Sequence, residues 1–251
     1  MRVLVVAGLD PSGGAGLTAD LEALRGAGAE GWAVASAITA QGPAGVKAVA
    51  PVPADLLLAQ IDALVAGKGR QRVRVGAVKT GMLATAEVVQ ALAGRLSEAP
   101  LARTPLVVDP VLLATSGEPL FDPGPASLQA CLEPLLSRAA LVTPNLAELE
   151  ALTGRVISED ADAVTAAHEL PCRAVLVKGG HRRGAPVDLL VTADGVERIE
   201  GKRRPGTARG TGCRLASAIA GHLALGESIP SAVRKAKRLV ERYLDRAVTQ
   251  R

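Results

Sequence analysis

The stretch Val3–Gly16 reads VLVVAGLDPSGGAG. It begins with a continuous aliphatic run, Val3–Ala7, which is rich in β-branched residues and stops at Gly8. Such a run is typical of a strand buried in a parallel sheet. A glycine-rich turn and a segment with helical spacing, Leu17–Leu24, follow it. The sequence therefore predicts that the chain opens with a strand leading directly into a crossover helix.

The same alternation continues along the chain. Further aliphatic runs predict strands at Ala33–Thr39, Val73–Val78, Leu106–Asp109, Leu141–Thr143, Ala174–Lys178 and Val187–Val191. Helical spacing recurs at Ala54–Val65, Ala86–Leu96, Ala126–Leu136, Leu146–Leu152 and Ala161–Leu170, and two final helices are expected at Gly212–Leu225 and Ile229–Val248. This pattern predicts one α/β domain over residues 1–251, with a doubly wound parallel sheet and helices on both faces.

Composition narrows the class of protein. Apolar residues make up 48% of the 251, yet Phe, Tyr and Trp occur once each, so the core must consist mainly of Ala, Val and Leu. The formal charge of +4 is too small to indicate nucleic acid as a partner. Three widely spaced cysteines form no CxxC pair, which fits a reducing compartment rather than a disulfide framework or a zinc site.

No targeting signal is visible at the amino terminus. Residues 1–7 lack the basic region and long apolar stretch of a signal peptide, and no apolar run is long enough to cross a bilayer. We expect a soluble cytoplasmic protein without a membrane partner.

Polar and glycine-rich residues follow several predicted strands directly. Ligands of open α/β sheets bind beyond the carboxyl ends of the strands, so these residues are expected to share one rim. The first loop matches neither GxGxxG nor GxxxxGK[ST], which argues against a dinucleotide fold and a Walker loop. It is either a tight turn or a ligand loop, and Asp20, one turn into the next helix, would reach a ligand beneath it.

Arg209–Cys213 (RGTGC) opens a predicted helix. Gly210 and Gly212 around Thr211 allow successive backbone N–H groups to face one point, where the helix dipole adds positive potential. The segment therefore predicts an anion nest for a phosphoryl group. Cys213, in the first turn, is expected to have a lowered pKa and to accept a proton from a substrate hydroxyl or lie beside it, although a small buried filler is the alternative.

Asn145 and Glu148 lie three residues apart at the start of a predicted helix, after Pro144. This spacing satisfies a capping box, and it also suits a magnesium site that takes few protein oxygens and keeps several waters. Lys178, at a strand end before two glycines, is either a phosphate-neutralising residue or a solvated lysine.

Taken together, these loops resemble the hydroxymethylpyrimidine/phosphomethylpyrimidine kinases of thiamine biosynthesis, a branch of the ribokinase-like superfamily. The resemblance runs from about Val3 to about Gly226. It includes AGLDPSGGAGLTAD, TAQGPAGV, KTGML, VVDPV, SGEPL, TPNLAELEALTG, VKGGH and GTGC in the family's order.

The resemblance implies a ribokinase-like three-layer α/β sandwich that uses ATP and Mg²⁺ to phosphorylate a pyrimidine alcohol and then its monophosphate. It implies a homodimer as well. By motif position, the pyrimidine pocket would comprise Gly8, Asp20, Gln41 and Met82. The anion hole would comprise Gly210, Thr211, Gly212 and Cys213, and the magnesium and phosphate residues would be Asn145, Glu148 and Lys178.

Some positions depart from the family's pattern. Arg209 replaces a histidine before GTGC, Arg214 replaces a small hydroxyl residue after it, and Gly42-Pro43 replaces Asn-Thr after Gln41. The sequence ends at Arg251 without the family's glycine-rich tail. Two alternatives therefore accompany the kinase prediction: a pyridoxal kinase, and a catalytically weak relative that binds pyrimidine or nucleotide.

Overall fold

The computed structural model describes residues 1–42, 44–66, 74–114, 116–179, 186–202 and 209–249. The strands are β1 Arg2–Leu9, β2 Glu30–Gly42, β3 Gly45–Pro51, β4 Val75–Thr80, β5 Ala84–Thr85, β6 Leu106–Val108, β7 Phe121–Asp122, β8 Leu141–Val142, β9 Ala174–Val177, β10 Val187–Thr192 and β11 Gly195–Glu200. The helices are α1 Gly16–Gly26, α2 Ala54–Val65, α3 Ala86–Leu96, α4 Leu128–Leu136, α5 Leu146–Thr153, α6 Asp160–Glu169, α7 Thr211–Ala224 and α8 Ile229–Thr249.

Nine of these strands form one sheet in the described part of the chain, in the order β11-β10-β9-β8-β6-β4-β1-β2-β3. The central pairs from β2 through β1, β4, β6 and β8 to β9 are parallel. At the two edges, β3, β10 and β11 pair antiparallel to their neighbours. The run Val187–Val191 is thus a strand as predicted, but it pairs antiparallel with β9.

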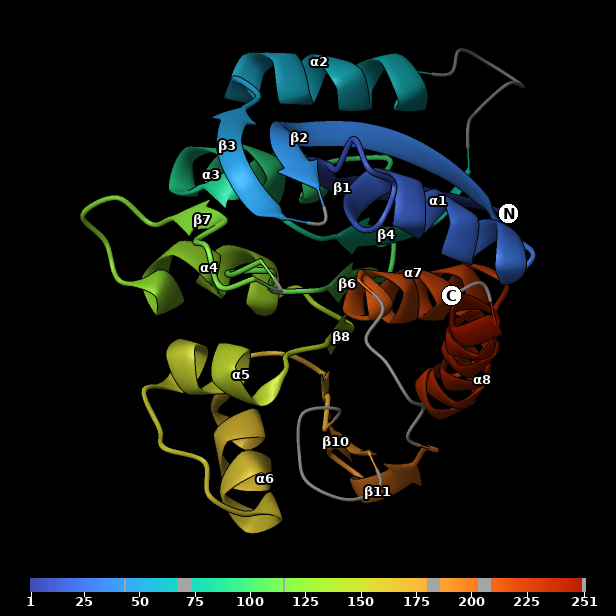
Figure 1. Ribbon diagram of the computed structural model, residues 1–251. Helices are drawn as coiled ribbons and strands as arrows, with labels where there is room; N and C mark the ends of the chain where they lie inside the picture. Colours follow the sequence, from blue (N-terminus) through green and yellow to red (C-terminus); the bar gives the residue numbers. More distant parts are fainter. Residues whose placement is uncertain (43, 67–73, 115, 180–185, 203–208, 250–251) are drawn as a thin grey trace.

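Helices cover both faces of the sheet (Figure 1). Alternate residues of β1 point to opposite faces, so Leu4 and Val6 pack in one core with α2–α6, whereas Val3 and Val5 pack in the other with α1, α7 and α8. Both cores consist almost entirely of Leu, Val, Ile and Ala, as the composition requires. The structure therefore confirms the predicted mostly parallel sheet between two helical layers.

The parallel strands deliver their carboxyl ends to one rim, and two helices start there. α1 begins at Gly16 directly after the first glycine-rich loop, and α7 begins at Thr211 directly after the second. In Figure 1 these helices lie side by side on one face, with α8 packed beside them. Within the described residues, no helix is both long and apolar enough to cross a bilayer.

Candidate active site

A completely buried ion pair lies beneath the rim. Lys79, near the end of β4, donates to Asp20 Oδ1 of α1 at 2.9 Å, and both side chains are 0% exposed. Ser217 of α7 donates to the same oxygen at 2.7 Å. These two contacts join the central sheet to the two helices that start at the rim.

The pKa values of this pair follow from its burial. Burial alone would lower the pKa of Lys79, but the negative charge of Asp20, with smaller effects of Cys213 and Asp109, raises it to about 12. Burial raises the pKa of Asp20, and Lys79 and Ser217 offset this only in part. The short contacts from two donors to one carboxylate oxygen indicate a charged pair.

Cys213 lies in the first turn of α7, close to this ion pair. Burial of the thiol raises its pKa to about 12, which Lys79 opposes and the nearby carboxylates Asp109 and Asp20 reinforce. The prediction of a lowered pKa was therefore wrong. The helix terminus favours a thiolate, but removal from water and two adjacent carboxylates disfavour it more strongly.

A second charged cluster joins the ends of β6 and β9 to the start of α5. Lys178 Nζ lies 2.9 Å from Asp109 Oδ1 and 3.5 Å from Glu148 Oε2. Thr143 donates to Asp109 Oδ1 at 3.2 Å. Lys178 is therefore held between two carboxylates, and the alternative of a freely solvated lysine was wrong.

Charge and burial set the pKa values in this cluster. Burial alone would raise the pKa of Asp109, but Lys178 and Lys79 hold it below its ordinary value. Burial raises the pKa of Glu148, Lys178 opposes this only in part, and Asp109 adds to it. The pKa of Lys178 is raised, because its two carboxylates outweigh the effect of burial.

Asn145 and Glu148 form the capping box of α5. Asn145 Oδ1 accepts from the Glu148 amide at 2.8 Å, and Glu148 Oε2 accepts from the Asn145 amide at 2.7 Å. The capping alternative is therefore confirmed. It does not exclude a second role, because carboxylate and amide oxygens can each accept more than one hydrogen bond.

The two glycine-rich loops touch at the rim. Gly210 has a φ of +69°, and a Cβ at this position would lie 2.3 Å from the carbonyl oxygen of Gly14. At Gly212 a Cβ would lie 3.2 Å from Lys178 Nζ. Glycine at Gly210 is thus required both by the left-handed backbone and by the close approach of the first loop. Lys178 lies beside the predicted anion nest.

Arg209 links the second loop to the first. Its guanidinium donates to Asp10 Oδ2 at 2.9 Å and to Ser12 Oγ at 3.1 Å. Asp10 in turn accepts from the amides of Ser12 and Ala15, at 2.9 and 3.0 Å, which shapes the first loop. The family-atypical arginine before GTGC therefore closes one loop against the other.

Arg214 makes a second link from the turn that follows. It donates to the Gly14 carbonyl at 3.0 Å and to Glu22 Oε2 of α1 at 2.8 Å. Its guanidinium carbon lies 4.0 Å from the centre of the Tyr243 ring. Only 5% of this arginine side chain is exposed. The second departure from the family pattern is thus a buried connection between α7, α1 and α8.

The residues predicted for the pyrimidine pocket are brought together only in part. Met82 Sδ lies 2.8 Å from the position of a Cβ at Gly8, so these two residues are adjacent. Gln41 is half-buried at the end of β2, where Oε1 lies 3.4 Å from Thr39 Oγ1. Asp20 lies at full burial beneath the rim, and its Oδ2 has no hydrogen-bond partner among the described residues.

The sequence did not single out two residues that the structure places at the centre. Lys79 and Asp109 are both buried, and Asp109 Oδ2 also lacks a partner within the described residues. Both stand in quoted motifs, KTGML and VVDPV, at the ends of aliphatic runs. A charged residue completing a buried strand was the available signal. Three further quoted positions lie outside the described residues: Pro43 of TAQGPAGV, and Gly180 and His181 of VKGGH.

The chain is similar to known proteins over almost its whole length. The family model described as phosphomethylpyrimidine kinase matches residues 10–250. The chain belongs to the phosphomethylpyrimidine kinase family. A hydroxymethylpyrimidine/phosphomethylpyrimidine kinase of Streptomyces coelicolor is 39% identical to this kinase over 242 residues, which are 95% of this chain and 86% of the relative.

A longer relative contains the same region as part of a larger protein. The thiamine biosynthesis bifunctional protein of Geobacter sulfurreducens is 41% identical over 243 residues, and this kinase spans 48% of its length. The match shows that the region occurs both as most of one protein and as about half of another.

Solved structures confirm the ribokinase-like α/β fold. The phosphomethylpyrimidine kinase of Clostridium difficile 630 is 33% identical with a TM-score of 0.79, covering 99% of both chains. The pyridoxal kinase of Staphylococcus aureus in complex with pyridoxal is 27% identical with a TM-score of 0.85, covering 97% of this kinase and 87% of that chain. Backbone similarity therefore does not separate the two substrate classes, whereas sequence identity favours the pyrimidine kinases.

Proposed function

We propose that this kinase transfers the γ-phosphoryl group of ATP to the hydroxymethyl group of 4-amino-5-hydroxymethyl-2-methylpyrimidine, and then phosphorylates the monophosphate to the diphosphate. The observation that carries the proposal is the position of Lys178. Its ammonium lies between Asp109 and Glu148 and next to Gly212, at the start of α7. Family membership supplies the substrate class.

The chemistry rests on positioning and on charge neutralisation. Phosphoryl transfer passes through a loose transition state, so the protein needs mainly to align the groups and to stabilise charge on the phosphoryl oxygens. Backbone N–H groups of residues 210–213 would bind these oxygens at the helix terminus, and the Lys178 ammonium beside them would add a full positive charge.

The donor set fits a magnesium ion held through few protein oxygens. Asp109 Oδ2 is buried without a partner among the described residues, and Glu148 lies across Lys178 from it. No group of three His, Cys, Asp or Glu suited to a metal occurs in that part of the chain, and Mg²⁺ bound with nucleotide needs only one or two carboxylates. Glu148 and Asn145 would hold the ion through water, with Asp109 nearby, and the ion would neutralise phosphate charge.

Cys213 contributes position rather than a thiolate in this proposal. Its raised pKa keeps the thiol protonated near neutral pH. The thiol therefore lies next to the substrate hydroxyl without acting as its base, which is the second of the two roles expected from the sequence.

The pyrimidine would lie above Gly8 and Met82. Met82 would pack on the ring, and the absence of a side chain at Gly8 leaves room for the Met82 thioether. Gln41 and Asp20 would supply hydrogen bonds. Because Asp20 is fully buried, its Oδ2 would reach the substrate only after a local displacement of the rim, and that atom has an unused acceptor site.

Product identification tests the proposal. Purified protein is incubated with Mg·ATP and one acceptor: the hydroxymethylpyrimidine, its monophosphate, or pyridoxal. Mass spectrometry then follows the products. We expect the pyrimidine diphosphate. Pyridoxal phosphate as the only product would move the assignment to pyridoxal kinase, the class of the structural relative from S. aureus. Tight pyrimidine binding without any phosphorylated product would show a binding protein instead.

Two further features belong to the proposal. We place the protein in the cytoplasm, because widely spaced free cysteines suit a reducing compartment. We also propose a homodimer, which the family resemblance suggests. Sedimentation of the purified protein at micromolar concentration would give twice the 25.5 kDa chain mass.

A further inference from the structure

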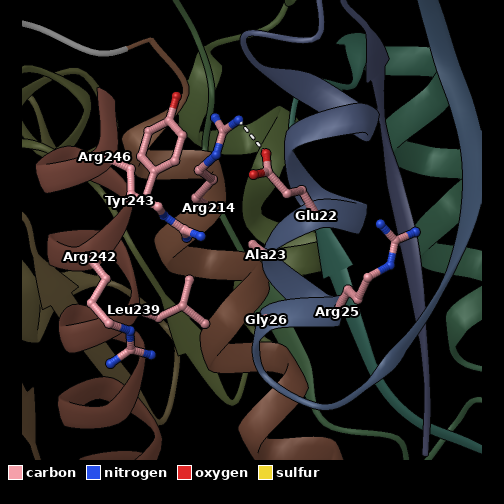
Figure 2. A pocket seen from close by; sticks show the side chains of 9 residues that line it. All are labelled: Glu22, Ala23, Arg25, Gly26, Arg214, Leu239, Arg242, Tyr243 and Arg246. Carbon is pink, nitrogen blue, oxygen red and sulfur yellow. Dashed lines mark hydrogen bonds and ion pairs between the residues drawn. The ribbon is translucent and has the colours of Figure 1, made fainter. Parts of the chain in front are cut away.

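A pocket separate from the rim lies between α1 and α8. Its volume is about 320 Å³. Its lining residues are Glu22, Ala23, Arg25, Gly26, Arg214, Leu239, Arg242, Tyr243 and Arg246. Figure 2 shows the walls: Glu22, Ala23, Arg25 and Gly26 come from α1, and Leu239, Arg242, Tyr243 and Arg246 come from α8. Arg214 reaches it from α7, behind the two walls.

The charge of this pocket is strongly positive. Four arginines and one carboxylate line it. The carboxylate, Glu22, already pairs with Arg214. In the described part of the chain, Arg25, Arg242 and Arg246 have no ion-pair partner. Arg242 and Arg246 are four residues apart on α8, so they are neighbours on its surface, where like charges disfavour the helix.

Helix dipoles account for part of this arrangement only. Arg25 and Arg246 lie in the last turns of α1 and α8, where positive charge is favourable. Arg214 lies near the N-terminal end of α7, where positive charge is unfavourable. Its guanidinium is nevertheless buried, and its Nε has no hydrogen-bond partner among the described residues. A buried cation that lines the pocket therefore keeps one donor without a partner among the described residues.

The chemistry of the walls identifies the class of ligand. Guanidinium groups bind phosphate oxygens through two parallel N–H donors, and several of them around a small pocket suit a polyanion. The pocket volume lies at the lower end of the range found for small-molecule sites, so the pocket suits a small ligand and excludes a large one. We propose that this pocket binds the diphosphate group of a small molecule, with Arg242 and Arg246 as its ligands and Arg214 at its base, whereas the Arg25 side chain extends away from α8 and adds only to the positive charge nearby (Figure 2).

The position of Arg214 would connect such a ligand to the rim. The same guanidinium that lines the pocket donates to the carbonyl oxygens of Gly14, at 3.0 Å, and Arg209, at 3.3 Å. These carbonyls belong to the two glycine-rich loops. An anion that attracts Arg214 would therefore act on the contacts that hold the loops together.

Calorimetric titration with inorganic pyrophosphate tests the site. The protein is first saturated with a non-hydrolysable ATP analogue, Mg²⁺ and the hydroxymethylpyrimidine, so that the rim is occupied. We compare the unsubstituted protein with the double variant Arg242→Gln/Arg246→Gln. The matched control is Arg238→Gln, because Arg238 is exposed on the same helix and does not line the pocket.

We expect one pyrophosphate per chain, with affinity reduced at least tenfold in the double variant and changed less than twofold in Arg238→Gln. Equal binding by all three proteins, or no binding by the unsubstituted protein, would overturn the site. An equal loss in Arg238→Gln would show a general charge effect instead. Citrate binding as tightly as pyrophosphate would overturn the assignment to a phosphate ligand. The titration does not depend on turnover, so its result can be interpreted even if the protein shows no kinase activity.

Discussion

Replacing Lys79 tests the buried ion pair that joins β4 to α1 and α7. In the variant Lys79→Met, the carboxylate of Asp20 would remain at 0% exposure without its cation, keeping only the bond from Ser217. Breaking a buried pair in this way costs about 3–5 kcal/mol. Since folded domains have a total stability of about 5–15 kcal/mol, the loss would be a large fraction of the whole.

Urea unfolding, followed by far-UV circular dichroism, would measure this loss in a double-mutant cycle. Lys79→Met and Asp20→Leu should each cost about 3–5 kcal/mol. The double variant should recover most of that loss, because no charge stays buried, apart from about 1 kcal/mol for the bond that Ser217 loses. Arg234→Met serves as the control: its ion pair with Glu197 is exposed on both sides and should contribute at most about 1 kcal/mol.

The same cycle has a pH dependence with a defined sign. The pKa of Lys79 is raised from 10.5 to about 12, so the stability that this shift contributes is present below pH 10.5 and is lost as the pH rises toward 12. The unsubstituted protein should therefore lose stability over this window relative to the double variant. Single variants that each cost less than about 1 kcal/mol, or a double variant whose cost equals their sum, would refute the buried pair.

Three further predictions concern the rim. Cys213, with a pKa of about 12, should react with iodoacetamide at pH 8 about a thousandfold more slowly than a free cysteine. Peptide mass spectrometry would measure this rate. A rate near that of free cysteine would contradict the raised pKa. Gly16→Ala should lower the melting temperature more than Gly28→Ala. Both positions have positive φ, but only at Gly16 would a Cβ lie 2.2 Å from the Gly8 carbonyl oxygen. Equal decreases in melting temperature would contradict this close contact. Arg209→Ala should speed amide hydrogen exchange in residues 12–15, since the Asp10 carboxylate that shapes this loop loses its cation. Exchange in α3 should stay unchanged. Unchanged exchange in the loop would show that Arg209 does not hold it.

Much of the fold could be predicted from the sequence, because parallel strands buried on both faces appear as continuous aliphatic runs. The runs that became β1, β4 and β9 are of this kind. The strands β3 and β11 were missed, since each lies at an edge of the sheet and its aliphatic run is interrupted, by the exposed Lys47 in β3 and by Glu197 and Arg198 in β11. An edge strand pairs with only one neighbouring strand and is less buried, so it needs no continuous apolar run.

The site was predictable where backbone geometry leaves a residue signature. Gly210 and Gly212 predicted the loop at the start of α7, and the three-residue spacing of Asn145 and Glu148 predicted the capping box. The partners of long side chains were not predictable in this way. Lys79 meets Asp20 from 59 residues away, and Arg214 meets Glu22 from 192 residues away. Only the fold brings such pairs together. It also buries the Cys213 thiol, and that burial raises the pKa that the helix terminus was expected to lower.

Turnover of the variant Lys178→Met tests the central claim most directly, that phosphoryl transfer takes place at Lys178 beside residues 210–213. Lys178→Arg keeps the charge and controls for the two carboxylates, and Lys47→Met, at an exposed lysine of β3, controls for loss of a surface charge. With Mg·ATP and the hydroxymethylpyrimidine, we expect kcat to fall about 10²–10³-fold in Lys178→Met, less in Lys178→Arg, and not at all in Lys47→Met. An unchanged kcat in a folded Lys178→Met protein would contradict the account.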